Sequence, residues 1–363
     1  MDRMDRLSIN LPHFKYDIII NDNFSTISHE IQSIWSGRKI VIITDDIVEK
    51  LYLRLLTNEL KKICPLIYSY VFPNGEDSKS VETLNQIYNF LLSKHIDRSD
   101  LIIALGGGVV GDVAGYVAAT YLRGVDYIQI PTTLLAQIDS SVGGKVAVNY
   151  QGYKNMIGAF YQPLLVYINL NVLETLPDRD YKCGIAEAVV HALITDSSLL
   201  DYIHANFSNI SGWKKCGIRE LVYRNCKIKA DIVLQDEKDK GIRKILNFGH
   251  TIGHAIEGLF GCKYRHGECI SVGIVGAFKL SVYLKLINVE KLAYIKTVLN
   301  DLGLPISFTD LDWNDIAKRI EFDKKTISKK ISFILPVDIG SVVIYELYCH
   351  TLAKFLSDEK LML

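Results

Sequence analysis

The first half of the chain alternates short, apolar, β-branched segments with stretches of helical periodicity. Five such segments stand at residues 39–44, 67–72, 101–105, 127–131 and 164–169. They are too short for amphipathic helices, and continuous apolar runs of this kind are typical of strands buried on both faces of a parallel sheet. Strands that alternate with helices predict an α/β domain. We expect this domain, with its parallel sheet, over residues 1–176.

The pattern changes after TLPDRD at 175–180. Amphipathic helical stretches dominate from there, at about 179–205, 213–235, 248–259, 267–286, 289–302 and 313–320, and two short strand-like segments follow at 330–336 and 342–347. Leu176-Pro177 followed by an acidic residue is a plausible helix start. We therefore expect a second, mainly α-helical domain over residues 177–363.

Composition excludes several classes of protein. Hydrophobic residues make up 49% and charged residues 23%, which is typical of a globular protein. Forty-one Lys+Arg balance 41 Asp+Glu, so nothing indicates a nucleic-acid or anionic membrane partner. The seven cysteines form no CxxC pair, which argues against a disulfide framework. With no signal-peptide pattern and no uncharged span, we expect a cytoplasmic protein.

A glycine cluster follows the third predicted strand. Residues 106–112 read Gly-Gly-Gly-Val-Val-Gly-Asp, contain the spacing G-x-G-x-x-G and precede a helical stretch. Glycines let backbone N–H groups approach a phosphate, and a helix start favours negative charge. The cluster departs from the usual dinucleotide fingerprint, because it follows the third strand and lacks an acidic residue about 20 positions later. Spacing alone leaves a phosphate site and a ligand-free turn both open.

A second polar segment runs from Asp139 through Ser140-Ser141 to Gly143-Gly144-Lys145, and Lys154-Asn155 follows it. The GGK triplet lacks the Ser or Thr that a P-loop requires. Two lysines beside serines and glycines are suited to a phosphorylated substrate. From spacing alone, a solvated loop is equally compatible with this segment.

Histidines and a carboxylate are concentrated in the second half. His250 and His254 stand at i and i+4, on one face of a predicted helix, and His266 follows twelve positions later. Imidazoles with a carboxylate can form a Zn²⁺ site, and spacing alone assigns both His250 and His254 to the metal ion. Glu187 lies in an apolar helical stretch, where it needs either a metal ion or a buried Lys or Arg as its partner.

These segments together resemble the 3-dehydroquinate synthases, a family of the sugar-phosphate cyclase superfamily. The similar segments are 73–79, 106–124, 128–145, 154–163, 236–257, 266–268 and the DKK at 323–325. The resemblance spans roughly residues 40–350. The segment DSSVGGK is more similar to this family than to cyclases of other sugar phosphates.

The resemblance implies sites for two cofactors. It implies that NAD⁺ binds the first domain through Asp45, Glu76, Lys79, Gly107, Gly108, Asp112, Thr132, Thr133, Lys145, Lys154 and Thr175. It assigns Zn²⁺ or Co²⁺ to Glu187, His250 and His266, so that His254 becomes an acid–base or substrate-contacting residue. The catalytic residues that it implies are His254, Lys145, Lys229, Arg243 and Asn247. Those implied for substrate binding are Arg123, Asp139, Lys154, Asn155 and Lys325, with Arg123 supplied by the partner subunit of a homodimer.

The activity implied is that of a carbon–oxygen lyase of the shikimate pathway, which leads to aromatic amino acids. The substrate, 3-deoxy-D-arabino-heptulosonate 7-phosphate, is oxidised transiently by NAD⁺ and loses phosphate. It is then reduced again, and an intramolecular aldol reaction closes the ring to 3-dehydroquinate.

Two positions depart from the family pattern. Val190 stands where the family has a lysine three residues after the metal-binding glutamate, and Val146-Ala147 replaces Thr-Gly after Lys145. A lost cation weakens charge-assisted binding of an anion. Three alternatives therefore remain: a sister cyclase with a different or amino-substituted substrate, a metal-dependent polyol dehydrogenase, and a non-catalytic protein that retains cofactor.

Overall fold

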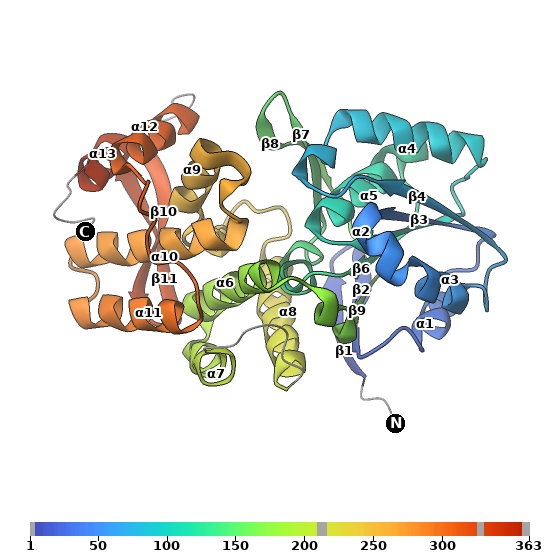
Figure 1. The fold of residues 1–363 in the computed structure, drawn as a ribbon, viewed down its shortest axis with the longest axis horizontal. Helices are drawn as coiled ribbons and strands as arrows, with labels where there is room; N and C mark the ends of the chain where they lie inside the picture. Colours follow the sequence, from blue (N-terminus) through green and yellow to red (C-terminus); the bar gives the residue numbers. More distant parts are fainter. Residues whose placement is uncertain (1–3, 209–215, 325–329, 358–363) are drawn as a thin grey trace. The chain divides into compact units, whose positions relative to one another are not determined.

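The computed structural model describes residues 4–208, 216–324 and 330–357. The chain forms two compact units, whose residue ranges can be followed along the sequence colours of Figure 1. Unit 1 comprises Met1–Leu176 with Ile218–Lys238, and unit 2 comprises Pro177–Gly217 with Asp239–Leu363. Ile218–Lys238 thus groups with unit 1, whereas the sequence analysis drew a single boundary after residue 176.

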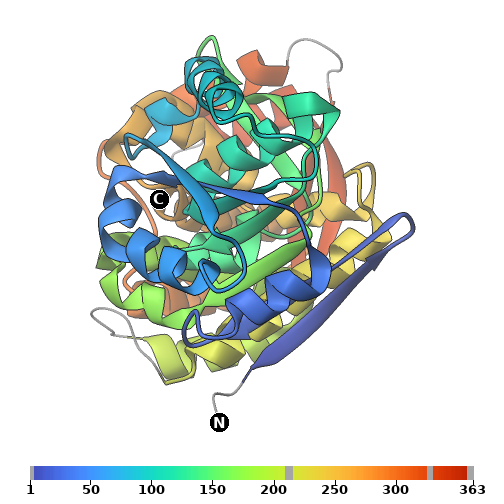
Figure 2. The ribbon, with the colours of Figure 1, turned by 90° about the vertical axis from the view of Figure 1, so that its right-hand side faces the viewer.

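Unit 1 is built on a seven-stranded sheet in the order β1-β2-β9-β6-β5-β3-β4. The strands are β1 (Asp5–Leu11), β2 (Phe14–Asn21), β3 (Lys39–Asp45), β4 (Leu66–Phe72), β5 (Leu101–Gly106), β6 (Tyr127–Pro131) and β9 (Leu165–Asn169). All neighbours pair in parallel except β1 with β2. This confirms the five predicted strands and the predicted α/β class. The β1–β2 hairpin, dark blue at one edge of the sheet in Figure 2, was not predicted, because polar residues alternate along β1.

Helices cover both faces of this sheet (Figure 1). Along β3, Ile40 and Ile42 face a core shared with α1 (Ile27–Ile34) and α3 (Arg54–Leu60). Val41 and Ile43 face the other core, shared with α4 (Val81–Ser93) and α5 (Gly108–Thr120). Both faces of the strand are therefore apolar, which explains why its sequence shows no alternation. The remaining helical elements are α2 (Asp46–Val48), η1 (Glu49–Leu53), η2 (Glu76–Ser78), η3 (Tyr121–Arg123), η4 (Ala136–Ser140), η5 (Leu170–Thr175) and α8 (Ile218–Gln235).

The segment predicted as a substrate-binding loop includes a hairpin. Strands β7 (Lys145–Tyr150) and β8 (Tyr153–Phe160) pair antiparallel in a sheet of their own. Most of β8 is exposed, including Lys154 and Asn155. Its apolar residues do not form the continuous run that identified the buried strands.

Unit 2 is mainly helical, as predicted. Its helices are α6 (Asp178–Thr195), α7 (Ser197–Phe207), η6 (Ile242–Asn247), α9 (His250–Phe260), η7 (Gly261–Lys263), α10 (His266–Tyr283), α11 (Val289–Asp301), α12 (Trp313–Lys324) and α13 (Cys349–Ser357). The predicted strands are confirmed as the antiparallel pair β10 (Lys330–Asp338) and β11 (Ser341–Tyr348). The stretch 179–205, expected as one helix, is two, because Asp196 leaves helical geometry and caps α7 through the N–H of Leu199. Within the described residues, no helix has the length and apolar character to cross a bilayer.

Candidate active site

Three helices of unit 2 bring a carboxylate and two imidazoles together. Glu187, 2% exposed, lies in the middle of α6, while His250 and His266 are the first residues of α9 and α10. The Oε1 atom of Glu187 lies 2.9 Å from Nε2 of His266 and 3.5 Å from Nε2 of His250. The three ligand atoms all lie within 4.8 Å of one another, which is compatible with a single metal ion.

Glycines allow these helices to approach so closely. A Cβ on Gly267, next to His266, would lie 2.4 Å from the Cα of Cys183 on α6. A Cβ on Gly273 of α10 would lie 2.0 Å from the carbonyl oxygen of Gly249, which precedes His250 and has a φ of +77°. Because any side chain at these positions would force the backbones apart, the glycines are what let the three ligands meet.

The hydrogen bonds of the two histidines orient them for metal binding. Nδ1 of His250 lies 2.9 Å from the carbonyl oxygen of Phe248, and Nδ1 of His266 lies 3.1 Å from Oε1 of Glu257. With each Nδ1 donating its hydrogen, the Nε2 atoms face Glu187, so that a metal ion bound there would take the place of a proton on Nε2. Burial lowers the pKa of His266, but Glu187 and Glu257 outweigh it and raise that pKa to about 10. A cluster that favours positive charge and offers N and O donors fits a divalent metal ion.

A second group of possible ligands consists of His254, Glu257 and His266. It shares His266 with the first group, and its His254 is exposed. The first group is the more enclosed, because Glu187 is almost fully buried. The expectation from spacing, that His250 and His254 hold the same ion, is not favoured by the described part of the chain, where the two fall in different candidate groups. His254 belongs to the other group.

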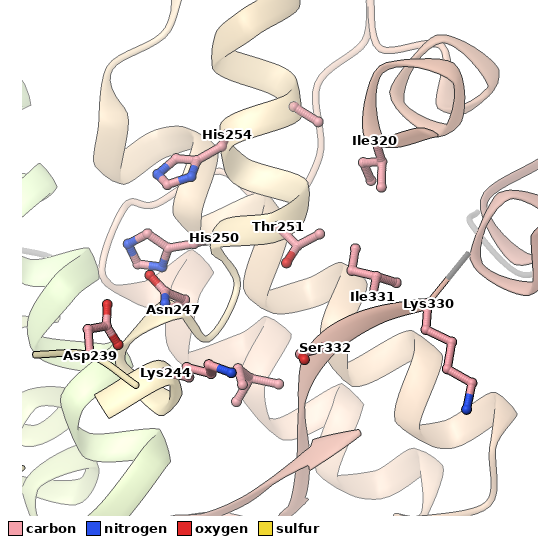
Figure 3. A pocket seen from close by; sticks show the side chains of 12 residues that line it. Asp239, Lys244, Asn247, His250, Thr251, His254, Ile320, Lys330, Ile331 and Ser332 are labelled. Atoms are coloured by element: carbon pink, nitrogen blue, oxygen red, sulfur yellow. The ribbon is translucent and has the colours of Figure 1, made fainter. Parts of the chain in front are cut away.

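A pocket of about 480 Å³ in unit 2 has His250, a member of the Glu187–His250–His266 cluster, in its lining (Figure 3). It is lined by Asp239, Lys244, Asn247, His250, Thr251, His254, Ala255, Ile320, Lys330, Ile331, Ser332 and Ile334. Asn247, His250 and His254 were expected at a site, whereas Asp239, Lys244, Thr251 and Ser332 were not singled out. Three of these four lie inside the segment 236–257 that carries the resemblance, but nothing local marks Ser332.

Two other residues expected in this region, Arg243 and Lys325, are not among the described residues that line the pocket. Arg243 is 2% exposed and does not line the pocket, although it neighbours Lys244 on η6. Lys325 lies outside the described residues.

The nucleotide-binding residues expected in unit 1 gather at the carboxyl ends of the parallel strands. The strand order reverses between β3 and β5, and ligands of open α/β sheets bind outside such a switch point. Asp45 ends β3, Gly107 and Gly108 follow β5, and Thr132 and Thr133 follow β6.

Buried groups at this edge of the sheet fit a polar ligand. The hydroxyls of Thr44 and Thr132 are buried, and neither has a hydrogen-bond partner among the described residues. A Cβ on Gly107 would lie 3.1 Å from Cγ2 of Thr133, so a side chain there would crowd the turn. Asp45 already accepts the N–H groups of Ile47 and Val48 at 2.9 Å, which fixes the start of α2.

Residues far apart in the sequence form a polar network in unit 1. Nζ of Lys79, a residue that is 7% exposed, lies 2.5 Å from both Oδ2 of Asp112 and Oδ1 of Asn155. Glu76 accepts a hydrogen bond from Asn149 at 2.8 Å, and Asn149 in turn accepts the N–H of Asn155. Burial raises the pKa of Asp112, and the charge of Lys79 offsets part of this effect. Lys79 and Asp112, expected at the nucleotide site, are thus linked directly to Asn155, expected at the substrate site.

A second ion pair joins Lys229 of α8 to Asp139 of η4. The ammonium contacts the Asp139 carboxylate and lies 2.7 Å from its carbonyl oxygen. The pair joins α8 to another element of unit 1. It also brings together two residues that were expected at the substrate site.

The other expected residues of unit 1 are more scattered. Lys145 and Lys154 are exposed on the β7–β8 hairpin. Arg123 is exposed and has a φ of +67° after Leu122 at +51°, an uncommon pair of left-handed residues that are not glycine. Thr175 bonds to the hydroxyl of Tyr52.

Comparisons with known proteins agree with the resemblance. Family models described as 3-dehydroquinate synthase N-terminal and C-terminal match residues 69–183 and 184–326. The 3-dehydroquinate synthase of Acetivibrio thermocellus is 44% identical over 341 residues, which cover 94% of this chain and 95% of the relative.

Solved structures support the fold. A 2-deoxy-scyllo-inosose synthase complexed with carbaglucose-6-phosphate, NAD⁺ and Co²⁺ has a TM-score of 0.89 at 23% identity, with 98% and 100% of the two chains covered. The 2-epi-5-epi-valiolone synthase of Streptomyces hygroscopicus, with NAD⁺ and Zn²⁺ bound, has a TM-score of 0.87 at 22% identity, with 96% and 97% covered. At these identities the likeness establishes the fold, whereas the family models and the 44% identity establish the family. The chain belongs to the 3-dehydroquinate synthase family.

Proposed function

We propose that the chain converts 3-deoxy-D-arabino-heptulosonate 7-phosphate into 3-dehydroquinate and inorganic phosphate. The observation that carries the proposal is the enclosed cluster of Glu187, His250 and His266 beside a polar pocket. Relatives named for this reaction are 44% identical over nearly the whole chain, whereas the cyclases of other sugars are 22–23% identical. This difference favours the heptulosonate over the substrates of the sister cyclases.

The overall reaction is that of a carbon–oxygen lyase. The bond between C7 and the phosphate oxygen breaks, a carbon–carbon bond closes the ring, and no net oxidation occurs. When bound, NAD⁺ accepts and returns a hydride, and a divalent ion such as Zn²⁺ or Co²⁺ polarises a substrate oxygen. The protein's own residues would bind and orient the substrate and exchange protons with it.

In unit 2, Glu187, His250 and His266 would hold the metal ion. His254 lines the pocket one helical turn after His250, where it can exchange a proton with a substrate oxygen. Asn247, on the same wall, can orient a hydroxyl or carbonyl group through its amide. Arg243 is assigned to the substrate by the family resemblance.

In unit 1, the residues at the carboxyl ends of β3, β5 and β6 would hold NAD⁺. The start of α5 would offer backbone N–H groups to the phosphates of NAD⁺. The ion pair between Lys79 and Asp112 holds these two charged side chains together. Thr175 belongs to the same set through the resemblance. Lys145, Lys154, Asn155, Asp139 and Lys229 would bind the anionic substrate, while Lys325 is carried over by the resemblance alone.

Assembly and location are part of the proposal. Arg123 would reach the substrate phosphate of the partner subunit in a cytoplasmic homodimer. Its exposure and its left-handed turn are compatible with a side chain that acts outside its own unit.

The test is a reaction of the purified full chain with the heptulosonate phosphate, NAD⁺ and Zn²⁺. We expect one phosphate per 3-dehydroquinate and no accumulation of NADH. One NADH per turnover, with glycerol or another polyol as substrate, would instead identify a dehydrogenase. Turnover of another sugar phosphate alone would identify a sister cyclase, and cofactor binding without any turnover would identify a non-catalytic protein.

A further inference from the structure

The pocket of unit 2 contains an ammonium group to which the resemblance assigns no role. Lys244 lies on η6, between buried Arg243 and pocket-lining Asn247. We propose that Lys244 binds an anionic group of the substrate, a carboxylate or a phosphate. This inference rests on the proposed function, because it takes the ligand of this pocket to be an anionic sugar acid.

The first argument is the electrostatic state of Lys244. Its side chain is half-buried, and no carboxylate in the described part of the chain forms an ion pair with it. A lysine can bury its methylene stem against apolar side chains while its ammonium stays accessible to a ligand in the pocket. A lysine with a partly buried side chain on a pocket wall, and with no ion pair to a described carboxylate, is therefore well suited to an incoming anion.

The second argument is the set of groups around the pocket. Ser332 of β10 and Thr251 of α9 contribute hydroxyls, and Asn247 contributes an amide. These groups can donate hydrogen bonds to the same anion that Lys244 attracts. Asp239 is the one carboxylate among the pocket-lining residues, and it forms no ion pair with Lys244 in the described structure. Figure 3 shows Lys244 extending from η6 toward the strand that carries Ser332.

The third argument is a contrast with the other lysine of the pocket. Lys330 lines the same cavity from the start of β10. Its Nζ lies 5.2 Å from the ring centroid of Tyr348, so its charge is engaged in a cation–π contact. In Figure 3 its side chain runs away from His250 and His254. Lys330 therefore serves as a matched control for a lysine that lines the pocket without binding its ligand.

The backbone makes the position of Lys244 well defined. The short helix η6 packs against β10, β11 and α6. Arg243, the preceding residue, is 2% exposed and anchors this turn in the interior. The backbone at Lys244 is therefore held in place by its neighbours. The Lys244 ammonium can bind a ligand without the entropic cost of ordering the main chain.

The experiment compares Lys244→Met, Lys244→Arg and Lys330→Met in the full chain loaded with Zn²⁺ and NAD⁺. A charge-assisted hydrogen bond contributes about 1.5–3 kcal/mol, so Lys244→Met should lower kcat/KM roughly tenfold to 150-fold, mainly through KM. Lys244→Arg should recover much of this loss, and Lys330→Met should stay within about twofold of the wild type. Metal content and Tm should be unchanged in all three variants.

Two probe ligands, each tested for binding to the wild type first, identify the anion, and if neither binds, the kinetics of the Lys244 variants decide. Quinate carries a carboxylate but no phosphate, whereas glucose 6-phosphate carries a phosphate but no carboxylate. Lys244→Met should weaken the binding of one of them, measured by calorimetry, and this result names the group that Lys244 contacts. Unchanged binding of both, kinetics equal to those of Lys330→Met, or a loss accompanied by lower metal content or Tm would each overturn the proposal. If the wild type makes no 3-dehydroquinate, the proposed function fails, but the two binding measurements still decide the role of Lys244.

Discussion

The candidate metal cluster of unit 2 (Glu187, His250 and His266) and the glycine turn of unit 1 are assembled in different ways. Glu187 and His266 are 79 positions apart and meet only because α6, α9 and α10 pack through glycines. Gly107 and Gly108 instead lie within one strand-to-helix connection. The first site depends on tertiary packing and on buried charge, whereas the second depends on local backbone geometry. Substitutions in the cluster should therefore lower metal binding or stability, whereas substitutions in the turn should mainly lower NAD⁺ affinity.

The largest effect is expected at the metal cluster. Glu187→Gln keeps the shape of the side chain but removes the charge that binds the ion. We expect metal content to fall to background and activity to fall more than about 100-fold. Mutation of a residue that only hydrogen-bonds a metal ligand typically costs about 10- to 100-fold. Elemental analysis and the phosphate-release assay measure both. A variant that retains one metal ion per chain would show that Glu187 is not a ligand.

Val190 tests how tightly this region is packed. It is 0% exposed on α6, so Val190→Lys should bury an ammonium without a partner and destabilise the fold by roughly 3–5 kcal/mol. Val190→Ala, the control, should cost about 2 kcal/mol. Denaturant unfolding gives both values.

Kinetics on the same Val190→Lys variant sharpen the test. Because Lys244 already offers an ammonium to the pocket of unit 2, no gain in kcat/KM is expected. A stable Val190→Lys variant with a higher kcat/KM would contradict this account. It would mean that the pocket accepts the lysine that the family has at this position.

Glu257 should act on the metal ion through His266. Its carboxylate accepts from Nδ1 and keeps Nε2 directed at Glu187. Glu257→Gln should weaken Zn²⁺ binding about 10- to 100-fold, measured by competition with a chelator.

Glu268 provides the control for that substitution. It lies in the first turn of α10 like His266, but it pairs with Arg179. Glu268→Gln should lower stability by up to about 1 kcal/mol and leave Zn²⁺ affinity within about twofold. An equal loss of affinity in both variants would mean that general damage to the start of α10, rather than orientation of His266, is responsible.

The smallest effect is expected at the glycine turn. Gly107→Ala places a methyl group 3.1 Å from Cγ2 of Thr133, a contact that a small shift can relieve. We expect NAD⁺ affinity to fall about tenfold, or about 1.4 kcal/mol, with little change in Tm.

Gly115→Ala, on the helix α5 that follows the turn, is the matched packing variant. Its methyl group would lie 2.5 Å from Cγ1 of Val146, so stability should fall by roughly 1–3 kcal/mol. If Gly107→Ala loses stability instead of NAD⁺ affinity, the turn serves packing alone.

The same contrast explains what could be predicted from the sequence. The strands β3, β5 and β6 were found because burial on both faces makes them continuously apolar. The β1–β2 hairpin and β8 were missed because each carries exposed polar residues that interrupt this pattern. A continuous apolar run predicts a strand that is buried on both faces. It does not predict a strand that has exposed polar residues.

The site shows a similar limit. Spacing found His250 but paired it with His254 rather than with Glu187 and His266, because a period of four residues cannot reveal how α6 and α10 pack. The set of Glu187, His250 and His266 came from the family resemblance. Neither route indicated Lys244 or Ser332, since their significance depends on a pocket formed by η6 and β10. The Lys229–Asp139 pair likewise depends on α8 joining unit 1.

The most direct test of the account is a metal titration of the stripped enzyme. The chain is freed of metal with a chelator, and Zn²⁺ is added back while 3-dehydroquinate, NADH and bound metal are measured together. We predict that activity returns in proportion to bound Zn²⁺, reaches its maximum at one ion per chain, stays absent in Glu187→Gln and leaves no NADH behind. Full activity of a chain shown by elemental analysis to contain no metal would contradict the account.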